Sequence, residues 1–564
     1  MEMQKYLMPS KLARAIPHQV VLCAVAFVAI IPLLFRGPSC GHDFEFHLLS
    51  WLEAASQFAH FSYPHWAFTP AWGAGEPRFL FYPPLSWTLG ALLGLMLPWK
   101  FVAIAFTWIA LSIAGMTMHR LVIRYVDSNA ALIAASLYVV NPYMLFTAYE
   151  RTAYGELLAA AWLPLLFAAM LATRVRIVPI AMALALIWLT NAPAGVMSSY
   201  ALAFVTVVRF IQSPGPARLH LATRVAAGTT LAFALAGFFL VPAVYEQRFV
   251  QVNMAVTTGM RPADHTLFHR MTGNAEDNDY HDDVVRAASL VAVTLLSGIA
   301  IAVFFARRNS LARADSPVVV LLLLTVLVAF LLTPASLFLW NHVPKLAFLQ
   351  FPWRLCALLG VTLALTSALA LKDRLPTLRS SLFPLPCLLL AAISLPAWGI
   401  FHQPCDGEDT VPYRVALFDS NRGTDATDEY TPIGADGDAL KKGDPPYWLL
   451  PANADVNTPA PADVSVGPAS DHLSLDLPQA EYLVLNRRQY PHWQIRINGV
   501  LAEPIDPKRE DGLITLRLPA GRDTIDLAWT NGGDQTIGFV ISALAAATTL
   551  ALGRKKRLAD GPKT

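Results

Sequence analysis

Charged residues and cysteines are both scarce in this 564-residue sequence. Only 15% of the residues are charged and the formal net charge is +2, which excludes the strongly basic surface typical of nucleic-acid-binding proteins. The five cysteines form no closely spaced pairs, so they indicate no zinc-finger-like site. We also find no phosphate-cradling glycine loop, no soluble-enzyme motif and no internal repeat. Cys40 and Cys405 both lie in segments predicted to be extracytoplasmic, where they can pair as a disulfide.

Long apolar runs predict a polytopic membrane protein. Hydrophobic residues make up 55% of the chain and cluster in blocks of about 20, the length that crosses the hydrocarbon core of a bilayer. The first block follows Lys5, Lys11 and Arg14 and is typical of an uncleaved signal anchor. Twelve spans are predicted, at roughly 19–35, 101–123, 129–147, 155–173, 177–190, 194–210, 222–244, 287–306, 317–340, 353–372, 381–400 and 535–552.

Basic residues at the ends of these spans orient the chain, because cytoplasmic connections are rich in Lys and Arg. They place both termini in the cytoplasm, with Arg554–Arg557 marking the C-terminal one. The apolar segment Phe79–Leu97 contains Pro83 and Pro84, and a crossing there would invert every later loop. We therefore predict a juxtamembrane or re-entrant helix within one long outer loop, residues 36–100. Other basic residues at predicted cytoplasmic ends include Arg120, Arg124, Arg174 and Arg176.

The chain changes character after residue 400. Residues 401–533 are polar and then alternate between apolar and polar side chains, which predicts an extracytoplasmic β-sandwich-like domain. Asn498–Gly499 and Ala520–Gly521 are predicted hairpin turns, and residues 404–470 receive no assignment. The organisation is thus a transmembrane domain 1–400, the β-rich domain, and a final helix with a basic tail, 534–564. The predicted strands are His472–Leu477, Glu481–Asn486, Gln494–Asn498, Leu513–Leu518 and Thr524–Trp529.

The run Gly41–His47 combines two acids and two histidines beside a membrane helix. A helix over 41–58 would be amphipathic and suited to the membrane surface, with Ser39 as its cap and Asp43 in its first turn. Alternatively, a carboxylate partly desolvated at the bilayer edge can act as a general base. A third alternative is a divalent cation held by Asp43, Glu45 and His47.

Two further clusters lie at helix ends on the same predicted side of the membrane. The first contains Glu150, Arg151 and Glu156, where the simplest alternative is an Arg151–Glu156 pair that closes a tight turn. The second runs from Lys345 to Arg354, whose basic groups can bind a phosphate or merely reach toward the lipid headgroups. Aromatic and polar side chains of the outer loop suit sugar rings or an interfacial aromatic belt, and its candidate substrate-binding residues are His42, Glu76, Arg78 and Tyr82.

Taken in order, these motifs resemble GT-C glycosyltransferases, and within them the bacterial membrane proteins called "6-pyruvoyl-tetrahydropterin synthase-related". The resemblance extends over nearly the whole chain. It implies an all-α polytopic fold in the bacterial inner membrane, with about 12 transmembrane helices and juxtamembrane helices in the first outer loop. The motifs that carry it are Gly41–Asp43, Phe81–Leu85, Asn141–Tyr143, Tyr149–Arg151 with Glu156, Gln350–Arg354 and Glu429–Pro432.

The resemblance implies transfer of a sugar from a polyprenyl-phosphate donor to a glycan or other cell-envelope acceptor at the outer face. Asp43 is then the expected base, with Glu45 and His47 as further catalytic candidates. The departing lipid phosphate is expected to contact Arg151, Arg354 and Lys345.

This reading predicts an outer cavity lined by Asp43, Glu150 and Arg354, and Glu150 and Glu156 are further substrate-binding candidates. A divalent metal cofactor is left open. The alternative functions are a transporter or flippase of lipid-linked saccharides and a non-catalytic envelope-assembly protein. Transport is disfavoured because the predicted spans contain few ionisable residues.

Overall fold

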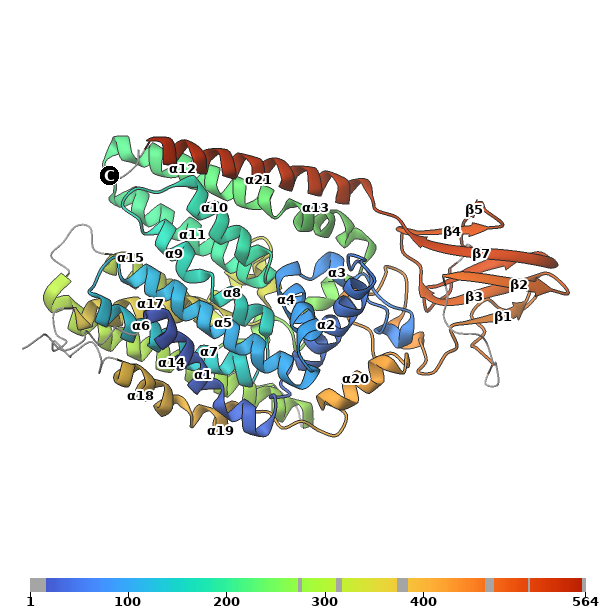
Figure 1. Cartoon of the computed structure of the whole chain (residues 1–564), viewed down its shortest axis with the longest axis horizontal. Helices are drawn as coiled ribbons and strands as arrows, with labels where there is room; N and C mark the ends of the chain where they lie inside the picture. Colours follow the sequence, from blue (N-terminus) through green and yellow to red (C-terminus); the bar gives the residue numbers. More distant parts are fainter. Residues whose placement is uncertain are drawn as a thin grey trace, which may run out of the picture.

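The computed structural model describes residues 17–271, 276–310, 317–372, 384–461, 471–505 and 508–559. The described chain is a helical bundle that carries a β-rich region at one end (Figure 1). Lys5, Lys11 and Arg14, which define the predicted signal anchor, lie outside the described residues.

Within the described residues, eight helical segments are long and apolar enough to cross a membrane, so the chain is a multi-pass membrane protein by length and composition. They include α1 (His18–Arg36), α5 (Trp99–Val122), α11 (Ala192–Gln212), the central part of α14 (Glu276–Ser310) and most of α21 (Gly533–Ala559). The other three are Ser128–Tyr149, with α6 (Ser128–Val139) and α7 (Pro142–Tyr149); Pro352–Leu371, with α17 (Cys356–Leu371); and Pro384–Phe401, with α18 (Pro384–Ser394) and α19 (Ala397–Phe401).

Two bent pairs raise this number to ten if each pair is one span. Helices α12 (Gly215–Leu235) and α13 (Gly237–Glu246) meet at 76°, and α15 (Val318–Leu331) and α16 (Leu337–His342) meet at 94°. Ten of the twelve predicted spans therefore have a counterpart. The remaining two, 155–173 and 177–190, correspond to shorter apolar helices: α8 (Tyr154–Ala160) followed by α9 (Leu163–Met170), and α10 (Ile177–Trp188). Pro164 restarts the helix after α8, since proline is accommodated in a first helical turn.

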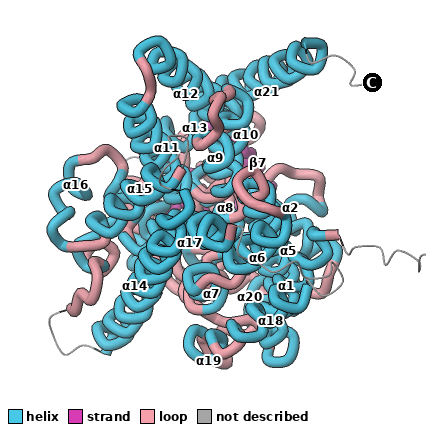
Figure 2. Tube along the Cα trace, turned by 90° about the vertical axis from the view of Figure 1, so that its left-hand side faces the viewer, coloured by secondary structure: helices cyan, strands magenta, loops and turns pink. Residues whose placement is uncertain are grey.

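Helix α17 occupies the middle of the bundle and packs against α6 and α14 (Figure 2). Most of its residues are buried, which explains why its sequence is apolar on all sides. Helix α21 lies at the periphery along α12 and α13 (Figure 1).

The predicted first outer loop contains α2 (Phe44–Ala59), α3 (Arg78–Phe81) and α4 (Pro84–Met96). Helix α4 begins at the Pro83–Pro84 pair and ends before Pro98, as the short helix predicted there requires. Helix α2 was predicted to lie on the membrane surface, and that prediction is wrong. It packs against α4, and its side chains from Phe44 and from His47 to Ala55 are buried.

The β-rich region follows α20 (Val411–Asp419) and contains two antiparallel sheets. One has the order β1-β3-β6 and the other β2-β7-β4-β5. Residues of both sheets, among them Leu483, Ile495 and Ile525, share one apolar core, as in a β-sandwich. The strands are β1 (Tyr447–Pro451), β2 (His472–Leu477), β3 (Glu481–Arg488), β4 (Trp493–Ile497), β5 (Val500–Ala502), β6 (Leu513–Leu518) and β7 (Gly521–Trp529).

One of the two predicted hairpin turns is confirmed. Asn498 and Gly499 have φ of 53° and 81° and connect β4 to its antiparallel neighbour β5. Ala520–Gly521 instead connects β6 of one sheet to β7 of the other, so the hairpin predicted there is wrong.

Candidate active site

The backbone just before α2 is held tightly against the end of α7. A Cβ atom on Gly41 would lie 2.1 Å from the carbonyl oxygen of Glu150, so only glycine fits there. The Asp43 amide donates a hydrogen bond to the carbonyl of Arg151, with N···O 3.0 Å. The predicted capping roles are wrong. Ser39 donates to the carbonyl of Tyr149, and the Asp43 side chain makes no capping hydrogen bond although Asp43 precedes the helix.

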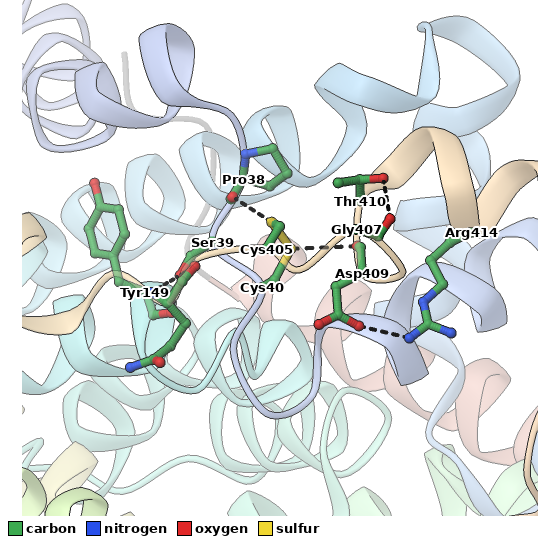
Figure 3. The surroundings of a disulfide bond; sticks show 10 residues. Pro38, Ser39, Cys40, Tyr149, Cys405, Gly407, Asp409, Thr410 and Arg414 are labelled. Atoms are coloured by element: carbon green, nitrogen blue, oxygen red, sulfur yellow. Dashed lines mark hydrogen bonds and ion pairs between the residues drawn. A yellow bond between two sulfur atoms is a disulfide. The ribbon is translucent and has the colours of Figure 1, made fainter. Parts of the chain in front are cut away.

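A disulfide links this segment to the chain after α19. Cys40 and Cys405 are bonded, as Figure 3 shows, which decides a pairing that the sequence allowed but left open. The Ser39 hydroxyl also accepts a hydrogen bond from the amide of Gln403, with N···O 2.8 Å. The segments after α1 and after α19 are therefore fastened together beside Asp43.

Asp43 forms an ion pair with Arg151. Arg151 Nη2 lies 3.2 Å from Asp43 Oδ2, and 33% of the Asp43 side chain is exposed, whereas that of Arg151 is buried. Burial raises the pKa of Asp43, but Arg151, with Arg354 and, at acid pH where they are protonated, His47 and His42, lowers it by more. The net pKa lies below its ordinary value, so Asp43 is ionised at neutral pH.

Arg354 joins the same cluster from the start of the α17 span. Its Nε lies 3.2 Å from Glu156 Oε2, and the other oxygen of Glu156 accepts a hydrogen bond from the Tyr143 hydroxyl. The predicted Arg151–Glu156 pair is thus wrong, because each residue has a different partner. The guanidinium carbons of Arg151 and Arg354 lie 4.8 and 4.6 Å from the centre of the Phe351 ring. Two cations therefore share one aromatic platform.

The two histidines of the run are neutral at physiological pH. Burial, with Arg151, lowers the pKa of His42 to about 4, and its Nε2 lies 3.9 Å from Glu150 Oε1. Burial, with Arg78 and Arg151, also lowers the pKa of His47 to about 4. The Tyr82 hydroxyl lies 3.5 Å from His47 Nε2. These histidines shape the site and carry no positive charge there.

Glu45 points to a different neighbour. Its Oε1 accepts a hydrogen bond from Arg414 Nη1 at 2.6 Å, and Arg414 also binds Asp409. Burial raises the pKa of Glu45, and Arg414 opposes that rise. Among the described residues, Asp43, Glu45 and His47 do not bring their ligand atoms close together, so the geometry does not favour the metal alternative.

The remaining candidates divide between supporting and distant positions. Glu76 and Arg78 are buried and bind each other, with Nε···Oε1 2.8 Å, and both bind Thr427. They tie the outer loop to the segment before the β-rich region. Lys345 is exposed, and its Nζ contacts Gln247 and the ring of Phe348, so the structure does not bring it to the cluster.

The outer cavity predicted to be lined by Asp43, Glu150 and Arg354 stays a prediction. Glu150 lines a cavity of about 740 Å³ together with Tyr280 and Asp283, but the lining of that cavity does not include Asp43 or Arg354.

The sequence did not indicate the roles of two residues near the cluster. Phe351 lies inside a recognised motif, yet no local signal shows that its ring supports two arginines. Arg414 lies in the segment that received no assignment.

No family model matches the chain, and no curated protein matches it. The narrower group suggested by the motifs therefore stays a prediction. Among solved structures, the chain is similar to the arabinofuranosyltransferase AftD from Mycobacteria, with 18% identity over 71% of this chain and 28% of AftD, and a TM-score of 0.39.

Two further solved structures show similarity at 13% identity. The archaeal oligosaccharyltransferase AglB from Archaeoglobus fulgidus, solved with a dolichol-phosphate, is covered over 59% of its length and 72% of this chain, with a TM-score of 0.33. ArnT from Cupriavidus metallidurans, solved with undecaprenyl phosphate, is covered over 93% of its length and 77% of this chain, with a TM-score of 0.29. The similarity is low by both measures, so the functional proposal depends on this chain's own residues.

Proposed function

We propose that this protein is a GT-C-type membrane glycosyltransferase, which transfers a sugar from a polyprenyl-phosphate donor to a cell-envelope acceptor. The observation that carries the proposal is one cluster in which an ionised, partly exposed carboxylate, Asp43, adjoins two largely buried guanidinium groups, Arg151 and Arg354. A transferase of this kind needs a base for the acceptor hydroxyl and positive charge for the leaving phosphate.

Arg151 is the better candidate to contact the phosphate. Its Nε and Nη1 atoms are buried and have no hydrogen-bond partner among the described residues. Buried donors without partners are costly, and a phosphate oxygen would satisfy them with charge-assisted hydrogen bonds. Arg354 already donates to Glu156, to the carbonyl of Leu349 and to Gln350, so it contributes mainly its charge.

Asp43 is the proposed base. Its carboxylate takes the proton of the acceptor hydroxyl while the hydroxyl oxygen attacks the anomeric carbon of the sugar. The bond from that carbon to the phosphate oxygen breaks, and the polyprenyl phosphate leaves with the bonding electron pair beside Arg151. Attack opposite the leaving group inverts the anomeric carbon. Asp43 is preferred to Glu45 because Glu45 is engaged by Arg414.

The disulfide supports an extracytoplasmic position for the site, because disulfides persist in oxidising compartments. Helix α5 begins next to the outer loop, and its 24 residues extend for about 36 Å to the other end of the bundle. Arg120 and Arg124 lie at that far end and line a cavity there together with Arg174 and Arg176. This arrangement agrees with a basic cytoplasmic face, cytoplasmic termini, and a site at the outer face of a bacterial inner membrane.

Sugar transfer from defined polyprenyl-phosphate donors to envelope acceptors tests the proposal, with wild type compared with Asp43→Asn. The asparagine can still accept a hydrogen bond from Arg151, so the fold should persist. We expect a loss of about 100-fold or more in the transfer rate, the usual contribution of a general base. The matched control is Asp476→Asn, an exposed carboxylate on β2, which should transfer at the wild-type rate. Equal transfer by Asp43→Asn and wild type would remove Asp43 as the base, and no transfer by wild type with any donor would overturn the function.

A further inference from the structure

Far along the chain from the proposed active site, three side chains from separate segments meet where α13, α21 and the β-rich region join. Glu246 is the last residue of α13, His492 immediately precedes β4, and Asp534 is the second residue of α21. One atom of each side chain can serve as a ligand, and these atoms all lie within 4.8 Å of one another. His492 Nε2 lies 3.0 Å from Glu246 Oε1.

We propose that Glu246, His492 and Asp534 bind a divalent transition-metal ion that fastens the β-rich region to α13 and α21. This site goes beyond the proposed glycosyltransferase function and does not depend on it.

The burial of the two acids points to a cation between them. Glu246 is 0% exposed, His492 is 7% exposed and Asp534 is 9% exposed. The Oδ2 atom of Asp534 is buried and has no hydrogen-bond partner among the described residues. Two buried carboxylates at this separation repel each other unless a cation or a shared proton lies between them. A proton, shared by the two carboxylates or held on His492 beside Glu246, is therefore the competing explanation that an experiment must exclude.

The surroundings are those of a prepared metal site. The Tyr490 hydroxyl donates a hydrogen bond to the other oxygen of Glu246, with O···O 2.8 Å, and the amide of Thr530 donates to the backbone carbonyl of His492, with N···O 2.9 Å. Such outer partners fix the orientation of metal ligands. A Cβ atom on Gly532 would lie 2.2 Å from Asp534 Oδ1 and 2.6 Å from His492 Cε1, so a glycine is needed for the ligands to approach.

The donor set selects the class of metal. One imidazole nitrogen and two carboxylate oxygens suit Zn²⁺, which binds such ligands at about 2.0–2.2 Å and accepts three protein ligands plus a fourth from solvent. Ca²⁺ and Mg²⁺ prefer sites made of oxygen alone. The ligands belong to two membrane-associated helices and to the β-rich region, so the bound ion would resist separation of the three.

The test is metal binding by the full-length protein in detergent, purified without chelators. Bound metal is measured by mass spectrometry, and Zn²⁺ is then titrated into chelator-treated protein. We expect wild type to bind about one Zn²⁺ per chain and to melt at a higher temperature when it is bound. His492→Gln should bind Zn²⁺ at least about 100-fold more weakly, because even changes to the outer partners of metal ligands cost about 10- to 100-fold in affinity. His472→Gln is the matched control, because it alters an exposed His–Asp pair in the same region and should bind as wild type does.

Asp534→Asn provides a second variant if His492→Gln does not fold. It should also lose the zinc-dependent rise in melting temperature. Wild-type protein that binds no Zn²⁺ would overturn the proposal and leave a proton as the explanation. Binding that is unchanged in the folded His492→Gln or Asp534→Asn protein would place the metal elsewhere and would also overturn it.

Discussion

Replacement of Arg151 by methionine removes the cation that keeps Asp43, the proposed base, ionised. Methionine keeps much of the arginine's apolar bulk but removes its charge. Burial alone raises the pKa of Asp43, and Arg151 is the strongest of the groups that lower it. Without Arg151, the pKa of Asp43 therefore rises, and the carboxylate takes up a proton at a higher pH than in wild type.

The distance between the charged atoms sets the size of the effect. Two unit charges at about 4 Å attract each other by about 4 kcal/mol at an effective dielectric constant of about 20. The observed Nη2···Oδ2 distance is 3.2 Å, and 33% of the Asp43 side chain is exposed. Solvent screening reduces the attraction, and we take about half of it, about 2 kcal/mol, as the loss of carboxylate stabilisation in Arg151→Met. Loss of one donor to the leaving phosphate should also reduce transfer by about 100- to 1,000-fold at every pH.

The assay is the initial rate of sugar transfer between about pH 5 and about pH 9. Arg151→Met should show both the overall loss and an acid-side decline that begins at higher pH than in wild type. Arg414→Met is the matched control, since it removes the cation beside Glu45 and leaves the Asp43 pair intact. Its acid-side decline should coincide with that of wild type. If Arg414→Met moves the decline and Arg151→Met does not, then Glu45 is the base and the reasoning about Asp43 is refuted.

Three further predictions follow from the same region. Thiol labelling of the denatured, unreduced protein should modify three cysteines, and reduction should add two, because Cys40 and Cys405 are bonded; five labels before reduction would refute the pairing. Gly41→Ala should lower the free energy of unfolding by about 1–3 kcal/mol, because its Cβ would overlap the carbonyl of Glu150; an unchanged melting temperature would contradict this. The pKa of His47 falls from 6.5 to about 4 on folding, so neutral His47 favours the fold fully above pH 6.5 and progressively less as the pH falls toward 4, by about 3 kcal/mol at most. His47→Gln should reduce the loss of melting temperature over that interval, and an identical loss would refute it.

The predictions that succeeded depend on local sequence pattern. Strands β2 and β6 have the predicted bounds. Exposure alternates along β2, as its sequence pattern predicts, whereas β6 is buried on both faces apart from Arg517. Pro83–Pro84 correctly marked the start of α4. Asp43, Arg151 and Arg354 were predicted on one side of the membrane in separate motifs, and the Asp43–Arg151 ion pair and the shared Phe351 ring bring them together, while their roles stay predictions.

The predictions that failed depend on contacts between distant segments. Strand β1 lies in an irregular Pro- and Asp-containing stretch and owes its conformation to pairing with β3. Local rules gave Asp43 a capping role. Its charge-assisted hydrogen bond with Arg151, 108 residues away in the chain, is stronger than a capping hydrogen bond from a neutral backbone amide. The bend between α12 and α13 leaves no sequence signal as clear as a proline at the break, which explains why one straight span was predicted there.

The position of Asp43 depends on the backbone more than on its own side chain. Gly41 touches the carbonyl of Glu150, and the amide of Asp43 binds the carbonyl of Arg151. The disulfide at Cys40 fastens the same segment from the other side. The proposed base and the cation beside it are therefore connected through main-chain contacts that a change of rotamer cannot break. Such preorganisation is what electrostatic catalysis requires, because the charges need not rearrange as the transition state forms. Lys345 contrasts with this arrangement, since its side chain is exposed and its ammonium group contacts Gln247 and the ring of Phe348. Fixed placement, and not positive charge as such, thus favours Arg151 over Lys345 as the proposed phosphate ligand.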